Sequence, residues 1–533
     1  MGSLERSDNV IKSEYASRGS GEFYRHGRAS SVDGDDSPPK GDLSRLRQML
    51  GPEPEVVHVP QPTRRVGWFA SGFVIALVLG VVIGLLVIVE FPALFGKGSN
   101  TKTAEFGSRF DNSKPQEANS AGASAAPNAP AAAQPAGGAP ARVANLGSAT
   151  EPAPTVRGVT DTEIRFGMSA PFSGPAKELG QNMKLGVEAA FRVANGKGGV
   201  FGRQLRLIAA DDGYEPGRTA GTMKDLYEKD QVFGVIGNVG TPTAVVALPY
   251  ALDRKMLFFG AFTGAGLLRS DPPDRYVFNY RASYAEETAA VVNYLVKVKG
   301  LLPEQIAVFA QQDAYGDAGY AGVEKAIRSL RGGNAGSILR LGYQRNTVDV
   351  DDAAAQLAQA QQQRPQLPIK AVIMVPTYRA AAKFIEKTRD HYPDMIYTSV
   401  SFVGSTALAN ELMLLGKKYA TGVIVTQVVP ALAGHSDLVL DYKAALAKYF
   451  PGEEPDYVSL EGYVDAMLLI AALQQNGAAL DTEKLVTTLE NIRDLDIGIG
   501  TPMAFSRSEH QAVHKVWGTQ LDADGHYQPI DLQ

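Results

Sequence analysis

Two histidines have the residue type and spacing that metal chemistry requires. His510 and His514 lie four positions apart, so both imidazoles could bind one metal ion if they shared a helix. The residues between them are Gln511, Ala512 and Val513, and none of these supplies a third ligand. The sequence therefore predicts no metal site here.

The motifs of common catalytic sites do not occur in this chain. Cysteine is absent, which excludes disulfides, thiolate metal sites and cysteine nucleophiles. Neither the GxxxxGK[ST] phosphate loop nor the GxSxG nucleophile elbow is found. The glycine-rich stretch 196–202 follows a predicted helix and precedes a predicted strand, the wrong order for dinucleotide binding. We therefore expect no catalytic residues and no cofactor, and a binding protein rather than an enzyme.

Thr241 has a position suited to binding an anion. It follows the predicted strand Val232–Gly237 and begins the predicted helix Thr241–Arg254. Its hydroxyl and the free N–H groups of the helix start could together hold a carboxylate or another oxygen anion. An ordinary N-cap threonine would occupy the same position, so both interpretations stay open.

The charge of the chain argues against a nucleic-acid partner. Among 533 residues, 52 are Lys or Arg and 57 are Asp or Glu, which gives a net charge of -5. A protein that binds nucleic acid normally carries a basic stripe. Hydrophobic residues make up 44% of the chain, which is enough to form buried cores.

The elements that would position such residues form an alternating pattern from about Val159 onward. The predicted strands are Ile164–Ser169, Arg203–Ala210, Val232–Gly237, Met256–Gly260, Ile306–Ala310, Ser337–Tyr343, Ala371–Val375, Ile396–Val400 and Thr421–Thr426. The predicted helices are Leu179–Ala194, Gly217–Lys229, Thr241–Arg254, Ala285–Val298, Ala318–Leu330, Val350–Gln362 and Tyr378–Arg389. This α/β alternation predicts parallel sheets covered on both faces. The stretch is too long for one hydrophobic core, so we expect two lobes that bind a ligand at the carboxyl ends of their strands.

A membrane anchor is predicted ahead of this region. Residues 1–65 are polar, with ten basic and ten acidic side chains, and we expect a disordered cytoplasmic tail. Residues 66–89 are 24 consecutive uncharged, mostly apolar residues, which as a helix would span roughly 36 Å against a hydrocarbon core of about 30 Å. Arg64 and Arg65 precede the span and place the N-terminus in the cytoplasm. The expected location is the inner (cytoplasmic) membrane, with one crossing and an extracytoplasmic or periplasmic C-terminal domain.

A linker of residues 90–157 connects the predicted span to the α/β region. Fifteen alanines and six prolines fall between Ala118 and Pro154, and the prolines prevent a continuous helix. We expect a semi-extended tether that keeps the following domain, residues 158–533, near the membrane.

Four stretches of the α/β region resemble the type I periplasmic solute-binding proteins of ABC transporters, in particular the branched-chain amino-acid (Leu/Ile/Val-binding) family. They are Ser169–Pro175 (SAPFSGP), Ala194–Leu205 (ANGKGGVFGRQL) running into Ala210-Asp211-Asp212, Val235–Thr243 (VIGNVGTPT) and Asp313–Gly319 (DAYGDAG). The resemblance covers about residues 160–533. It implies two Rossmann-like lobes joined by a three-crossover hinge, with lobe one at 160–281 and 430–505 and lobe two at 282–429 and 506–533.

The same resemblance implies a set of ligand-binding residues. Thr241, with the loop that holds Ala261 and Thr263, would bind the anionic end of the solute in lobe one, and Ser173 lies in a further loop of that lobe. In lobe two, Tyr315 and Tyr378 match aromatic residues that close over the ligand. Tyr457 would close the site from the later segment of lobe one.

One position departs from the family pattern. Members that bind α-amino acids place an acid near the end of the strand that here is Ile396–Val400, and in this chain Ser401 stands there. A buried ammonium without a partner would cost several kcal/mol. Asp313 and Glu461 are the two candidates for the missing charge. Otherwise the ligand would be a neutral amide, an aliphatic or aromatic carboxylate, or a less usual amino acid.

These features together predict a membrane-anchored solute-binding protein that captures a small molecule for an ABC permease. The alternative is a ligand-sensing receptor that signals through partner proteins, with the N-terminal tail as its output. A hydrolase on the same fold has no visible pair of nucleophile and base.

Overall fold

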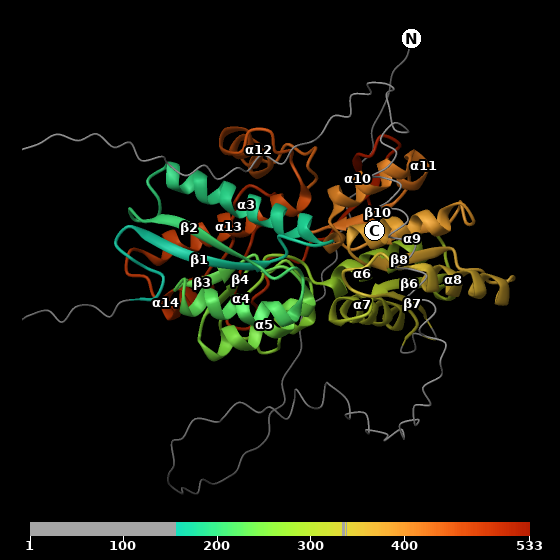
Figure 1. The fold of residues 1–533 in the computed structure, drawn as a ribbon, viewed down its shortest axis with the longest axis horizontal. Coiled ribbons are helices and arrows are strands. Elements are labelled where there is room, and N and C mark those ends of the chain that lie inside the picture. Colours follow the sequence, from blue (N-terminus) through green and yellow to red (C-terminus); the bar gives the residue numbers. More distant parts are fainter. Residues whose placement is uncertain (1–155, 333–335, 337) are drawn as a thin grey trace, which may run out of the picture. The chain divides into compact units, whose positions relative to one another are not determined.

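The computed structural model describes residues 156–332, 336 and 338–533, which form two α/β lobes (Figure 1). Within these ranges, no helix combines the length and the apolar character needed to cross a bilayer. The predicted tail 1–65 and span 66–89, and all of the predicted linker 90–157 except its last two residues, lie outside the described residues.

Lobe one is built on a parallel five-stranded sheet with the strand order β2-β1-β3-β4-β5. Its strands are β1 (Glu163–Ala170), β2 (Gln204–Asp211), β3 (Gly234–Ile236), β4 (Leu257–Phe259) and β5 (Val277–Phe278). The three central strands β1, β3 and β4 are almost wholly buried, as expected for a parallel sheet with helices on both faces.

Six helices belong to lobe one, and Figure 1 shows α3 and α4 on opposite faces of its sheet. They are α3 (Lys177–Gly196), α4 (Pro216–Glu228), α5 (Thr241–Asp253), α12 (Asp437–Tyr449), α13 (Tyr457–Asn476) and α14 (Thr482–Leu489). Helices α3 and α13 pack closely because Gly186 has no side chain. A Cβ at this position would lie 1.8 Å from the carbonyl oxygen of Ser459. The late helices α12, α13 and α14 therefore complete a lobe that the chain began almost three hundred residues earlier.

Lobe two contains a seven-stranded sheet with the order β12-β11-β10-β9-β8-β6-β7. Its strands are β6 (Ile306–Gln311), β7 (Leu339–Tyr343), β8 (Ala371–Val375), β9 (Ile396–Ser399), β10 (Ile424–Gln427), β11 (Trp517–Leu521) and β12 (Tyr527–Ile530). The first five are parallel to one another, and the two C-terminal strands add an antiparallel edge next to β10.

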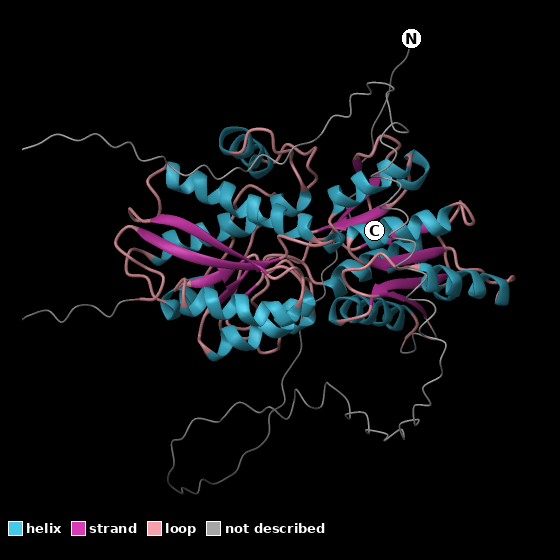
Figure 2. Ribbon diagram, viewed as in Figure 1, coloured by secondary structure: helices cyan, strands magenta, loops and turns pink. Residues whose placement is uncertain are grey.

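The helices of lobe two cover both faces of this sheet (Figure 2). They are α6 (Tyr284–Asn293), α7 (Ala314–Leu330), α8 (Asp351–Gln363), α9 (Tyr378–Arg389), α10 (Ser405–Leu415) and α11 (Lys417–Ala420). Helix α6 starts with a capping box in which Ser283 and Glu286 satisfy each other's backbone N–H groups. This cap fixes the point at which the chain enters lobe two.

The chain passes between the lobes three times. The crossovers run from β5 to α6, from β10 to α12, and from the segment near residue 513 to β11. The predicted start of the last lobe-two segment was residue 506. In the structure, however, His510 accepts a hydrogen bond from the backbone of Asn279, and Gln511 forms a bridge with Asn279 beside β5. Residues 506–513 thus run along lobe one, because the final crossover needs only the few residues before Trp517.

Candidate functional site

Three hydroxyl groups come together at the carboxyl ends of the lobe-one strands. Thr241 begins α5 and Thr263 follows β4, and their Oγ1 atoms are 2.7 Å apart. Tyr284, the first residue of α6, lies beside them. Burial raises the pKa of Tyr284 to about 12, although Arg281 and the two threonine hydroxyls act in the opposite direction. The two threonine hydroxyls are polar neighbours of the Tyr284 hydroxyl, which makes no hydrogen bond of ordinary geometry among the described residues.

An aromatic ring from lobe two fills the space next to these hydroxyls. Phe402 follows β9 and stacks on Phe262 of lobe one, with ring centroids 5.0 Å apart. Its ring also lies 4.6 Å from Tyr315, 6.2 Å from Tyr214 and 6.3 Å from Tyr284. All five side chains are buried, so the lobes meet here in direct contact.

A buried arginine links the lobes beside this aromatic contact. Arg281, in the first crossover, donates to Glu461 of α13 at 3.2 Å and to Glu287 of α6 at 3.0 Å. It also donates to the Ser401 hydroxyl of lobe two. Glu287 additionally accepts from the Ser401 N–H at 2.8 Å and from the Thr426 hydroxyl at 2.5 Å. One guanidinium therefore holds carboxylates of both lobes.

The protonation of this cluster follows from burial and pairing. Burial alone would lower the pKa of Arg281, but the charges of Glu461 and Glu287 outweigh it and raise this pKa, so the guanidinium stays charged. Burial raises the pKa of Glu461 to about 7, although Arg281 opposes the rise. Burial also raises the pKa of Asp465 well above its usual range, and Glu461 adds to this effect. Both oxygens of Asp465 lack a partner among the described residues.

Four of the eight residues predicted from the sequence meet in this contact. Thr241 and Thr263 supply hydroxyls, Tyr315 packs on Phe402, and Ser401 binds Arg281. Ala261 is close in sequence, but it is buried within the lobe-one core, where its carbonyl accepts from the Thr263 N–H.

The other three predicted residues lie elsewhere. Ser173 is exposed, and its hydroxyl donates to Asp211 at 2.6 Å. Tyr378 borders a pocket of about 420 Å³ between α3 and α10, and Tyr457 borders one of about 470 Å³ next to Tyr527. Along the chain these residues lie close to residues of the interlobe contact, but in the structure each of them has other neighbours.

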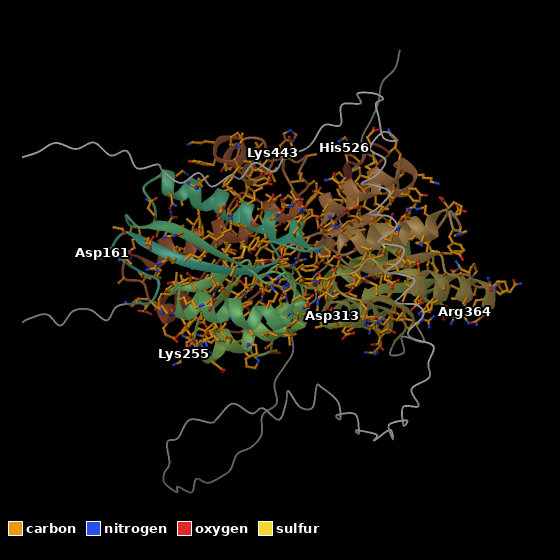
Figure 3. All side chains as sticks on the ribbon, in the orientation of Figure 1. Asp161, Lys255, Asp313, Arg364, Lys443 and His526 are labelled. Atoms are coloured by element: carbon orange, nitrogen blue, oxygen red, sulfur yellow. The ribbon has the colours of Figure 1, made fainter. Side chains whose placement is uncertain are left out.

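The two acids considered as partners for a ligand ammonium are already engaged. Asp313 lies between the lobes (Figure 3) and accepts from Arg345 at 2.9 Å, from Gln311 at 2.7 Å and from the Tyr315 N–H at 3.0 Å. Glu461 pairs with Arg281. Ser401, the position at which the family pattern has an acid, accepts a hydrogen bond from Arg281 instead.

The residues that the sequence did not single out are Arg281, Tyr284, Glu287 and Phe402. Glu287 falls in the predicted helix Ala285–Val298 and Tyr284 directly precedes it, positions where a glutamate and a tyrosine are ordinary surface residues. Arg281 is charged, which by itself suggests exposure. Only their burial in the contact between lobes marks them, and no local pattern encodes that contact.

The two histidines with metal-like spacing line one pocket of about 910 Å³ but have different partners. His510 stacks on Phe278 at 4.0 Å, and burial lowers its pKa. His514 lies 2.6 Å from Glu286, and this contact raises the pKa of the imidazole. Within residues 156–332, 336 and 338–533, no three His, Asp or Glu side chains group together as metal ligands would.

A second contact closes the lobes at their rim. Glu215, which caps α4 in lobe one, accepts from Arg345 at 3.0 Å and from Asn346 at 2.6 Å, both of which follow β7 in lobe two. Asn346 also donates to the carbonyl of Gly213 at 3.0 Å. The described conformation is therefore closed.

Two α/β lobes joined by three crossovers, and meeting at the carboxyl ends of their strands, define a two-lobed binding protein. The chain belongs to the periplasmic binding protein family, whose profile matches residues 163–526.

Relatives of known structure share this architecture. A possible leucine/isoleucine/valine-binding protein from Rhodopirellula baltica is 42% identical, with a TM-score of 0.65 over 72% of this chain and 99% of that chain. A substrate-binding periplasmic protein from Ralstonia solanacearum is 23% identical, with a TM-score of 0.62 over 69% of this chain and 100% of that chain. By sequence, the Leu/Ile/Val-binding protein BraC3 of Rhizobium johnstonii is 24% identical over 340 residues, which are 63% of this chain and 86% of that protein.

Proposed function

We propose that this chain is an extracytoplasmic solute-binding protein that captures a small amino acid, amide or carboxylate for an ABC-type uptake system. The observation that carries the proposal is the meeting of Thr241 and Thr263 of lobe one with Tyr315 and Ser401 of lobe two. A solute held there would touch both lobes, so its binding energy would favour closure. The names of the relatives, which include Leu/Ile/Val-binding proteins and an amino acid binding protein of Pseudomonas aeruginosa, support this class of ligand.

Membrane attachment is part of the same proposal. The apolar span 66–89 would anchor the protein in the inner membrane, with the N-terminus in the cytoplasm and the binding domain outside. The linker 90–157 would then keep the domain near its permease. A tether of this kind raises the effective concentration of one partner for the other without any new contact.

Binding of a solute is tested by calorimetric titration of the purified full-length protein against a panel of amino acids, amides and carboxylates. We expect at least one of them to bind with micromolar or tighter affinity. Thr241→Val should weaken that binding about tenfold or more, since it removes a hydroxyl that donates to a charged group. Thr487→Val removes an exposed hydroxyl of α14 and should leave the affinity unchanged. The proposal fails if no solute of the panel binds, or if both variants bind it equally well.

Transport is separated from sensing by deleting residues 1–65 and measuring uptake of the bound solute in cells. A transport protein should retain uptake, because the span and the binding domain remain. Normal uptake that coexists with a lost cellular response to the solute would instead support the receptor alternative.

A further inference from the structure

Phe402 occupies the centre of the residues that we propose bind the solute. Its ring stacks on Phe262, which stands between Ala261 and Thr263, and packs on Tyr315 of lobe two. Phe402 has no exposed surface, and the predicted residues around it are exposed by 5% or less. A solute cannot reach these groups in the closed form unless this ring leaves.

The segment that carries Phe402 is suited to such a movement. The residue belongs to a three-residue turn, Ser401–Val403, between β9 and α10. Gly404 follows with a φ of 84°, a conformation that glycine adopts without steric cost. A change of backbone in this turn would move the Phe402 ring while β9 and α10 keep their places.

The aromatic side chains packed around Phe402 leave a space that fits a flat ring. Phe262 stacks on one side of Phe402 at an interplanar angle of 28°, while Tyr315 and Tyr284 meet it at 57° and 81°. Offset-stacked and edge-to-face arrangements of this kind favour aromatic groups beyond the area that they bury. A ligand that replaces Phe402 would recover these contacts only if it brought a ring of its own.

The charges around this ring favour a solute without an ammonium group. Glu287 is saturated by Arg281, the Ser401 N–H and Thr426, and Asp313 is held by Arg345 and Gln311. An ammonium placed here would have to break these pairs or stay unpaired, and either change costs affinity.

The last two acids nearby do not change this conclusion. Glu461 is paired with Arg281. Asp465 packs against Gly260, where a Cβ would come within 2.6 Å of its carboxylate, and burial raises its pKa well above the usual range, which disfavours the charged form that an ammonium would need. A carboxylate, in contrast, would find the hydroxyls of Thr241, Thr263 and Tyr284 and the N-terminus of α5.

We propose that the Phe402 ring occupies, in the described closed conformation, the position that a ring of the ligand takes, and that the natural solute is an aromatic carboxylate that lacks an amino group. This inference rests on the proposed function and narrows its ligand class. It also makes Phe402 a specificity-determining residue, since every solute must displace its ring.

The first test compares four ligands, two amino acids and their two counterparts without the amino group, by calorimetric titration of the unmodified full-length protein. Hydrocinnamate has the skeleton of phenylalanine without the amino group, and isocaproate has that of leucine without it. We expect hydrocinnamate to bind at least about a hundredfold more tightly than L-phenylalanine, because of the unpaired ammonium. It should also bind roughly tenfold more tightly than isocaproate, because of the ring. Tighter binding of L-phenylalanine or L-leucine overturns the inference but leaves the proposed function intact. Absence of binding by every solute overturns both.

The second test removes the ring. Phe402→Leu should bind hydrocinnamate roughly tenfold more tightly than the unmodified protein, because less apolar surface must be displaced. Phe384→Leu is the matched control, since Phe384 is also fully buried and stacks on Phe309 at 4.2 Å within lobe two. It should leave the affinity unchanged. Weaker binding by Phe402→Leu, with thermal unfolding matched to the control, would mean that Phe402 contacts the ligand rather than replacing it, and would overturn the inference.

Discussion

Arg281 donates hydrogen bonds to Glu461 of lobe one and to Glu287 of lobe two. The two carboxylates differ in how many other hydrogen bonds they accept. The Glu287 carboxylate accepts three hydrogen bonds, from Arg281, the Ser401 N–H and Thr426, whereas Glu461 accepts one, from the guanidinium. The poorly solvated Glu461 consequently has a pKa of about 7, raised by burial against the pull of Arg281. Protonation of Glu461 therefore stabilises the folded protein.

The direction of this linkage gives a test. A carboxyl group whose pKa rises from 4.5 to about 7 on folding stabilises the folded state fully below pH 4.5, and this contribution is lost as the pH rises through 7. Glu461→Gln cannot ionise, so it should lose less stability than the unmodified protein between pH 5 and pH 8. The difference should be on the order of 2–3 kcal/mol by urea unfolding. Parallel losses in the two proteins would show that Glu461 does not titrate in this range.

At the scale of elements, the contact of α3 with α13 joins the first helix of lobe one to a segment far along the chain. Gly186 of α3 packs directly on the backbone of α13 at Ser459, with Tyr463 one turn further on. Close contact of the two backbones leaves no room for even a methyl group at Gly186, and Gly462 of α13 approaches the Met183 carbonyl of α3 in the same way.

A single methyl group tests this contact. Gly186→Ala should lower the free energy of unfolding by about 1–3 kcal/mol, because its Cβ would overlap the carbonyl of Ser459. Gly221→Ala is the control, since Gly221 lies in α4 with open space around it and should gain up to about 1 kcal/mol from helix propensity. The two variants are compared by denaturant unfolding. Equal stabilities would mean that α3 and α13 can separate without cost.

The helices and strands that could be predicted from the sequence are those in which apolar and polar residues alternate with a clear period. Strand β8 and helix α9, for example, were both expected with the bounds that the structure has. Helix α13 was not, because it is buried on nearly every side and so has no polar face to reveal a helical period. Strand β5 has only two residues, which is too few for a pattern.

The candidate site likewise contains residues that the sequence could indicate and residues that it could not. Thr241 was predicted from local order, because it follows the strand β3 and begins helix α5, whereas Thr263 was expected from the family resemblance of the loop after β4. Their part in ligand binding stays a prediction. Phe402 and Arg281 act through partners in the other lobe, and those contacts arise only when the lobes close. Tyr378 and Tyr457 each begin a helix and border other pockets, and their part in ligand binding stays a prediction.

At the scale of the whole molecule, two groups of contacts hold the lobes closed, one near the crossovers and one far from them. The aromatic and Arg281 contacts lie near the hinge, whereas Glu215 meets Arg345 and Asn346 at the rim. The rim contact is partly exposed, so each of its bonds contributes little to stability, but all of them must break before the lobes can open.

Removal of the rim contact should therefore affect the rate of opening. Glu215→Ala should release bound solute several-fold faster, with little change in the rate of association, because the lost bonds form only after closure. Glu304→Ala removes a pair with Arg331 inside lobe two and should leave both rates unchanged. Stopped-flow measurement of dissociation checks both variants. Identical rates would show that the rim plays no part in holding the closed form.

Arg157, near the start of the described residues, fixes the place at which the chain enters lobe one. Arg157 donates to the carbonyls of Val232 and Phe233 and stacks over the Tyr227 ring at 3.9 Å, so the entering chain is fastened at the amino ends of the lobe-one strands. Figure 3 places nearby Asp161 at the pole of lobe one farthest from lobe two. Under the proposed membrane attachment, a force along the tether would therefore act on lobe one, and opening of lobe two would not require the attachment point to move.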